Sequence, residues 1–171
     1  MNNKEDGKIL VTGATGTVGS AVVKRLLPMS TVDSVRAAVH SINRDKEFRQ
    51  FANKGVEIVE LDYTKPETIT NAVKGVNKLF LQTLPTPRVT DIYFDIVKEA
   101  KKNDVNYIVK LSAMGAVSGS ETTLLRLHGE EEKIIKESGI PYTFLRPAAF
   151  MQNFVTQFGY TIKTQNAYYI P

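Results

Sequence analysis

The chain has 171 residues, a length typical of one domain, and its 42% hydrophobic and 23% charged residues are typical of a globular protein. It contains no cysteine, which excludes disulfides, thiolate zinc sites and a cysteine nucleophile. The net charge of +4 is modest, and the basic residues are scattered along the chain. No apolar run is long enough to span a bilayer, and the polar residues at the start are unlike a signal peptide. We therefore expect a cytoplasmic protein without a nucleic-acid or membrane partner.

A glycine-rich turn follows the first predicted strand. Residues 9–11 form a short apolar run typical of a buried strand, and residues 18–26 carry apolar side chains at helical spacing. Between them, VTGATGTVG places Gly13, Gly16 and Gly19 three residues apart. A strand, a glycine turn and a helix N-terminus together predict a site for a pyrophosphate. Gly13 would permit the tight turn, Gly16 the approach of the phosphates and Gly19 close helix packing; glycines that only turn the chain are the alternative.

Strands and helices alternate along the rest of the chain. The apolar patterns predict strands at 32–39, 56–61, 76–81, 107–111 and 142–145, and helices at 43–54, 65–74, 90–103 and 121–138. Pro66 is tolerated early in its helix, and Gly139 ends the last one. This alternation predicts an α/β fold with a doubly wound parallel sheet, which binds its ligand at the C-terminal ends of the strands.

Four motifs occur in order along the chain: VTGATGTVG, GVEIVELDYTKPETITNAVKGVNKLFL, HGEEEKIIKESG and SGIPYTFLRPAAFMQNF. Together they resemble the NmrA-like family of atypical short-chain dehydrogenase/reductases. That family includes NAD(P)H-dependent quinone reductases, triphenylmethane-dye reductases and redox-sensing regulators. The resemblance implies that residues 1–171 form an NAD(P)-binding Rossmann domain. It also implies a smaller substrate lobe beyond residue 171, so we expect this chain to be truncated or a fragment.

Candidate cofactor residues begin in the glycine turn, where they are Gly13, Thr15, Gly16, Thr17, Val18 and Gly19. After the second predicted strand no acid occurs before Asp45, whereas His40, Ser41 and Arg44 could accept a 2′-phosphate. An acid there would repel that phosphate, so the sequence favours NADPH over NADH. An ordinary polar loop is the alternative.

The resemblance implies further cofactor residues after the later strands. Asp62 and Tyr63 would cover the adenine, and Thr83 and Leu84 would line the adenosine and pyrophosphate. Ser112 takes the position of the usual catalytic serine, and Pro147 and Ala148 would lie against the nicotinamide, with Phe150 and Asn153 towards the substrate. The alternatives are that Tyr63 is a loop aromatic, that Leu84 only packs the loop, and that Phe150 and Met151 are core residues of a following helix.

The tyrosine and lysine that short-chain reductases usually carry on the next helix are absent here. His128 and Glu132 take their place and, four residues apart, would be neighbours on one helical face. An imidazole beside a carboxylate could donate a proton near neutral pH. His128 is therefore the candidate catalytic residue, and a plain surface pair is the alternative. With only two histidines, far apart in the pattern, no zinc site is predicted.

Three functions fit these observations. The first is an NADPH-dependent reductase of a quinone-like acceptor, because a hydride from the cofactor needs little acid–base help from the protein. The second is a sensor that binds NADP(H) and reports to a partner protein. The third is a truncated chain with little activity. We expect cofactor binding with weak or no quinone turnover, since the tyrosine–lysine pair and the substrate lobe are missing.

Overall fold

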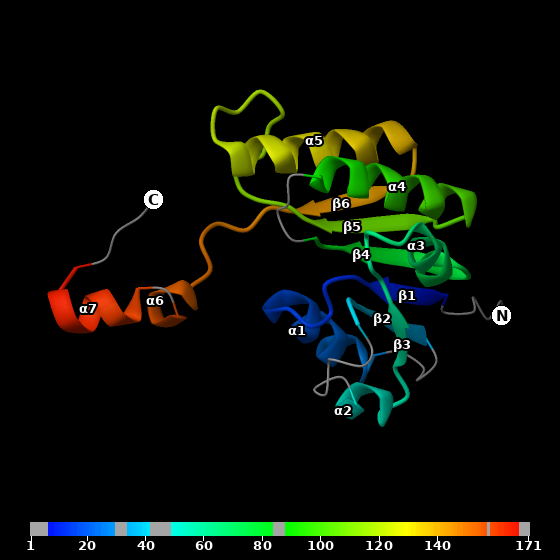
Figure 1. Ribbon diagram of the computed structural model, residues 1–171, viewed down its shortest axis with the longest axis horizontal. Coiled ribbons are helices and arrows are strands. Elements are labelled where there is room, and N and C mark those ends of the chain that lie inside the picture. The colour runs from blue at the N-terminus through cyan, green and yellow to red at the C-terminus, as the bar shows by residue number, and fades with distance from the viewer. Residues whose placement is uncertain (1–6, 30–33, 42–48, 84–87, 157, 168–171) are drawn as a thin grey trace.

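The computed structural model describes residues 7–29, 34–41, 49–83, 88–156 and 158–167 (Figure 1). Its strands are β1 Lys8–Val11, β2 Val35–Val39, β3 Glu57–Glu60, β4 Val76–Leu81, β5 Tyr107–Leu111 and β6 Tyr142–Leu145. Its helices are α1 Thr17–Leu26, α2 Arg49–Ala52, α3 Pro66–Val73, α4 Val89–Lys102, α5 Thr123–Ser138, α6 Asn153–Thr156 and α7 Gly159–Gln165. These elements alternate as predicted from β1 to β6.

All described strand pairs are parallel, and the sheet has the order β3-β2-β1-β4-β5-β6. The chain starts in the middle of the sheet, builds outward to β3, and then crosses to β4 on the other side of β1. Val11 of β1 therefore lies between Ala37 and Phe80. The strand order thus reverses beside β1, and doubly wound sheets bind their ligands at the C-terminal strand ends next to such a reversal. The predicted doubly wound α/β fold is confirmed.

Each face of the sheet is buried under helices. Leu10, Leu79 and Ile108 face a core that α3, α4 and α5 cover, whereas Val11 and Phe80 face a second core beneath α1 and α2. Successive residues of a strand point to opposite faces, so both faces need apolar side chains. Burial on both faces explains why residues 9–11 of the central β1 form a continuous apolar run, whereas the strand predicted at 56–61, observed as the edge strand β3, has alternating apolar residues.

Most predicted element ends lie within a few residues of the observed ones. Pro66 is the first residue of α3, and Gly139 (φ +77°) follows α5 in the left-handed conformation that glycine adopts at low cost. The second strand begins at Val35 instead of residue 32, and 30–33 lie outside the described residues. Only the last part of the predicted helix 43–54 is described, as α2.

Helices α6 and α7 were not predicted from the sequence. These helices stand apart from the sheet (Figure 1), and none of their described residues is buried. Phe150 and Met151 are 42% and 73% exposed and precede α6, so the alternative that they are core residues of a following helix is wrong. Without a core face, these short helices have no apolar stripe that sequence reasoning could find.

Candidate cofactor and active site

The glycine turn between β1 and α1 has the geometry of an anion site. Gly13 is left-handed (φ +59°), and the Gly16 N–H donates to the Gly13 carbonyl over 2.9 Å, which closes the turn. The Ser20 N–H donates to Gly16 O over 2.9 Å, so the amides of residues 17–19 have no carbonyl to bond within the helix. The first turn of α1 carries no acidic residue. The positive end of the helix therefore remains available to an anion.

The glycines of this turn differ in how much room they have. A Cβ on Gly19 would lie 2.1 Å from the Gly13 carbonyl oxygen, so the start of α1 packs directly against the turn. The close packing predicted at Gly19 is therefore present. A Cβ on Gly16 would meet Gly13 O at 3.2 Å and Gln82 Nε2 at 3.4 Å, which a small shift could relieve. Packing alone thus requires a glycine at 19 but not at 16.

Thr12 and Gln82 join the glycine turn to the end of β4, and sequence reasoning missed both. The buried Thr12 hydroxyl donates to Gln82 O over 2.7 Å and accepts the Gln82 N–H over 2.8 Å. The side chain of Gln82 lies against the turn, because a Cβ on Gly13 would meet it at 3.3 Å. Its Oε1 is buried and has no hydrogen-bond partner in the part of the chain that the structure describes. Only its place directly after an apolar strand could have suggested Gln82.

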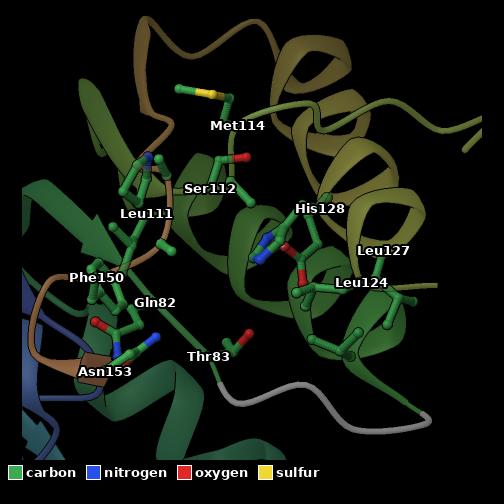
Figure 2. A pocket seen from close by; sticks show the side chains of 16 residues that line it. Gln82, Thr83, Leu111, Ser112, Met114, Leu124, Leu127, His128, Phe150 and Asn153 are labelled. Atoms are coloured by element: carbon green, nitrogen blue, oxygen red, sulfur yellow. Dashed lines mark hydrogen bonds and ion pairs between the residues drawn. The ribbon is translucent and has the colours of Figure 1, made fainter. Parts of the chain in front are cut away.

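A cavity of about 490 Å³ opens at the C-terminal ends of β4, β5 and β6 (Figure 2). Its wall is largely apolar, formed by side chains such as Leu111, Met114, Leu124, Leu127 and Phe150. It brings together these residues singled out from the sequence: Thr83, Ser112, His128, Pro147, Ala148, Phe150 and Asn153. Gln82 belongs both to this wall and to the surroundings of the glycine turn, so the two sites adjoin.

His128 is bound to Glu131, and the predicted pairing of His128 with Glu132 is wrong. His128 Nδ1 lies 2.9 Å from Glu131 Oε2. The same oxygen lies 2.6 Å from Nζ of Lys110, a fully buried residue of β5. Burial lowers the pKa of Lys110, and the Glu131 carboxylate only partly opposes this. Glu131 and Glu132 are each 2% exposed, so the alternative of a plain surface pair is wrong as well.

Glu132 instead holds Ser112 and Arg146. Ser112 Oγ donates to Glu132 Oε1 over 2.6 Å, and Arg146 binds both carboxylate oxygens, over 2.9 Å and 2.5 Å. Burial by itself would raise the pKa of Glu132, but the bonds from Arg146 and Ser112 outweigh it and lower that pKa. Although Ser112 lines the cavity, its hydroxyl therefore donates its hydrogen bond to Glu132 and not to a ligand.

This arrangement predicts a pH-dependent stability. A carboxyl with a lowered folded-state pKa stabilises the fold above its ordinary pKa, and the stabilisation is lost as the pH falls through the lowered value. We expect the free energy of unfolding to decrease below about pH 4.5, and Glu132→Gln to make this decrease shallower. Urea unfolding between pH 7 and 3 measures the effect. The control is Glu137→Gln, which should leave the pH dependence unchanged because that side chain is 65% exposed. If the free energy of unfolding decreases with pH equally in wild type and in Glu132→Gln, Glu132 does not have a lowered pKa.

The residues predicted to hold the adenosine end lie after β2 and β3. His40 is exposed and Ser41 is half-buried at the end of β2, while Arg44 and Leu84 lie outside the described residues. Asp62 Oδ1 accepts bonds from the Thr64 N–H (3.0 Å) and hydroxyl (2.7 Å), which order the turn and lower the pKa of Asp62.

Tyr63 is partly buried and packs against the core that α3, α4 and α5 cover. Burial raises the pKa of Tyr63 to about 12, so its phenol stays protonated in the physiological range. Tyr63 lies in the turn after β3, so both its predicted contact with the adenine and the alternative of a loop aromatic remain open. Because all strands are parallel, the residues after β2 and β3 share one edge of the sheet with the glycine turn and the cavity.

Comparisons with known proteins agree with this geometry. Residues 13–168 match the family model described as NAD(P)H-binding. The chain is 30% identical over 164 residues to the NAD(P)H azoreductase of Xenophilus azovorans, covering 95% of this chain and 55% of that protein. The Citrobacter sp. triphenylmethane reductase complexed with NADP(H) has a TM-score of 0.76 at 32% identity, covering 86% of this chain and 51% of that one.

The NADPH-dependent quinone oxidoreductase of Escherichia coli, complexed with NADPH, has a TM-score of 0.79 at 27% identity and covers 91% of this chain and 54% of that one. The present chain thus spans about half the length of the curated relatives it matches. Among the described helices, none is long and apolar enough to cross a membrane. The described residues also contain no cluster of three or more side chains that could hold a metal ion.

Proposed function

Because this chain belongs to the NAD(P)H-binding family, we propose that it is an NADPH-dependent reductase of planar, quinone-like acceptors. One observation carries the proposal: the glycine turn and the apolar cavity adjoin through Gln82, so a dinucleotide bound at the turn can reach the cavity. The acceptor class is supported by the names of the relatives, which reduce azo compounds, triphenylmethane dyes and quinones. We further propose that residues 1–171 are the NAD(P)-binding domain of this reductase.

The residues of the turn fit a dinucleotide. The amides of Thr17, Val18 and Gly19 would bind the pyrophosphate, with Thr15 and the Gly13 turn beside it and Gly16 allowing it to approach. The buried, unpartnered Oε1 of Gln82 is consistent with a ligand donor at the same place. His40, Ser41 and Arg44 would hold the 2′-phosphate, and Asp62, Tyr63, Thr83 and Leu84 the adenosine and adjoining phosphate.

The cavity fits the reacting end. Pro147 and Ala148 would lie against the nicotinamide, near Ser112 and His128. When bound, the cofactor supplies a hydride. The apolar wall would orient a planar acceptor and exclude water from it. In its imidazolium form, His128 would give the Nε2 proton to the reduced acceptor, which is its proposed catalytic role, and the neutral ring left behind would keep the Nδ1 hydrogen beside Glu131.

The proposed function is tested by steady-state oxidation of NADPH with a panel of quinones. Turnover above the protein-free rate that decreases in His128→Ala supports the reductase. We expect it to be slow, because Phe150 and Met151 beside the cavity remain exposed and leave the site partly wet. A calorimetric titration with NADPH separates the alternatives: binding without any turnover would favour the sensor, and no binding would contradict both.

The absence of an acid after β2 predicts cofactor selectivity. We expect NADPH to bind more tightly than NADH by about 1–3 kcal/mol, because one hydrogen bond to a charged group contributes about 1.5–3 kcal/mol. Arg44→Ala should narrow this gap, because it removes a cation that could pair with the 2′-phosphate. Calorimetric titration with NADPH and with NADH measures the difference in affinity. Arg25→Ala, an exposed arginine in the last turn of α1, is the control and should change neither affinity; equal wild-type affinities would contradict the selectivity.

A further inference from the structure

A buried lysine lies behind the cavity, and the proposed function does not use it. Nζ of Lys110 is surrounded by Glu131 Oε2 at 2.6 Å, the Leu111 carbonyl oxygen at 3.1 Å, the Tyr93 hydroxyl at 3.2 Å and His128 Nδ1 at 3.2 Å. The side chain of Lys110 is fully buried, that of Glu131 is 3% exposed, and that of His128 is 23% exposed. Glu131 and His128 both line the cavity, and His128 is the more exposed of the two.

The protons of this cluster determine which nitrogen of His128 carries a hydrogen. An ammonium group has three N–H donors, and the three oxygen atoms around Nζ can accept all of them. Nδ1 of His128 then lies 2.9 Å from the Glu131 carboxylate, which only accepts hydrogen bonds. A bare Nδ1 could accept from the Lys110 ammonium over 3.2 Å, but its lone pair would then also lie 2.9 Å from the carboxylate oxygen, which repels it. The favourable arrangement therefore has the hydrogen on Nδ1.

The other ring nitrogen is then bare. Within the described part of the chain, Nε2 of His128 has no hydrogen-bond partner, and His128 lines the cavity. Figure 2 shows its ring among the lining side chains, with Ser112 and Thr83 nearby. The Ser112 hydroxyl donates to Glu132, so it offers no donor to His128.

We propose that the Lys110–Glu131 ion pair holds neutral His128 in the Nδ1–H tautomer, which makes Nε2 a hydrogen-bond acceptor in an apolar cavity and selects ligands that carry an O–H or N–H donor. Lys110 and Glu131 are positioning residues in this proposal, and His128 is the residue that contacts the ligand. The ligand class rests on the proposed function, in which a reduced, hydroxyl-bearing aromatic is the product. The tautomer does not, because it is a property of the chain alone.

Nitrogen-15 NMR of the labelled, cofactor-free chain tests the tautomer. The chain has two histidines, and His40 is exposed, so it reports the Nε2–H form that histidine prefers in water. At a pH where both rings are neutral, we expect His128 to show a protonated Nδ1 and a bare Nε2, opposite to His40. His40→Gln assigns the signals. A His128 spectrum with the Nε2–H pattern of His40 would overturn the proposal.

A nearly isosteric variant tests the role of the ion pair. Glu131→Gln replaces the carboxylate by an amide, which can also donate to Nδ1, so we expect His128 to shift towards the Nε2–H form. Glu130→Gln, one residue away on α5, is the matched control and should leave the tautomer unchanged. An unchanged tautomer in a folded Glu131→Gln protein would contradict the role of Glu131. Should that variant not fold, the wild-type spectrum still decides the tautomer.

A pair of aromatic probes tests the ligand class. Hydroquinone carries two hydroxyl donors, and 1,4-dimethoxybenzene has a similar shape without donors. We expect hydroquinone to move the Nε2 resonance of His128, while the dimethoxy compound perturbs only apolar cavity residues such as Leu124. Equal effects of the two probes on Nε2 would refute donor selection. Since neither NADPH nor turnover is involved, this result stands or falls separately from the reductase proposal.

Discussion

Replacing Gly16 with valine should abolish NADPH binding and leave the fold nearly intact. The backbone of Gly16 is extended (φ −79°, ψ 169°), a conformation open to valine, and its Cβ would have contacts no closer than 3.2 Å. A valine side chain would occupy the space in which phosphates approach the amides of α1. Losing two hydrogen bonds to a charged group, at about 1.5–3 kcal/mol each, corresponds to at least a hundredfold weaker Kd. Calorimetric titration with NADPH measures the loss.

Two further glycine variants are its controls. Gly119→Val should bind NADPH like wild type, because a Cβ there meets nothing within 4 Å. Gly19→Val should instead disrupt the fold, since its Cβ would lie 2.1 Å from the Gly13 carbonyl oxygen, and thermal unfolding would report this. A Gly16→Val protein that is folded, with a Tm near that of wild type, and binds NADPH normally would show that the pyrophosphate does not lie at this turn.

Replacing Lys110 with methionine should destabilise the fold far more than replacing a lysine on the surface. The substitution leaves the Glu131 carboxylate, 2% exposed, without the ammonium that lies 2.6 Å from it. Breaking a buried ion pair by removing one partner costs about 3–5 kcal/mol, because the remaining charge is buried and uncompensated. Urea unfolding at neutral pH measures the change in the free energy of unfolding.

The comparison that isolates this ion pair is a double-mutant cycle. Lys110→Met/Glu131→Met removes both charges and should be more stable than Lys110→Met alone, because no uncompensated charge remains. Lys133→Met is the surface control: that lysine is 66% exposed and 3.8 Å from Glu137, so the change should be less than about 1 kcal/mol. If Lys110→Met lowers the free energy of unfolding as little as Lys133→Met does, the buried charge of Glu131 is not stabilised by Lys110.

The sequence determined the framework of this protein because the framework rests on local patterns. Gly13 had to turn the chain directly after an apolar run, and the observed φ of +59° is the reason for a glycine there. Gly19 had to allow the helix to pack on that turn, which the 2.1 Å approach confirms. The apolar run at residues 9–11 indicated a buried strand, and the alternation of strands with helices along the chain indicated a mainly parallel sheet.

Sequence spacing was insufficient for the site residues. On α5, Glu131 and Glu132 follow His128 by three and four residues, and both spacings place a side chain beside the imidazole. The tertiary structure decided between them: Lys110 of β5 binds Glu131, while Ser112 and Arg146 bind Glu132. No spacing along α5 contains this information.

Lys110 and Gln82 show why some site residues could be found only from the tertiary structure. Lys110 shares a strand face with the buried Ile108, so the strand carries it into the core, where a lysine by itself would not be expected. Its burial is tolerated because Glu131, the Tyr93 hydroxyl and a carbonyl oxygen surround its ammonium. Gln82 meets the glycine turn because β4 lies beside β1, a neighbour some 70 positions away in sequence. Local periodicity sets which residues form strands and helices, but the partners of a buried polar group depend on which elements the sheet order brings together.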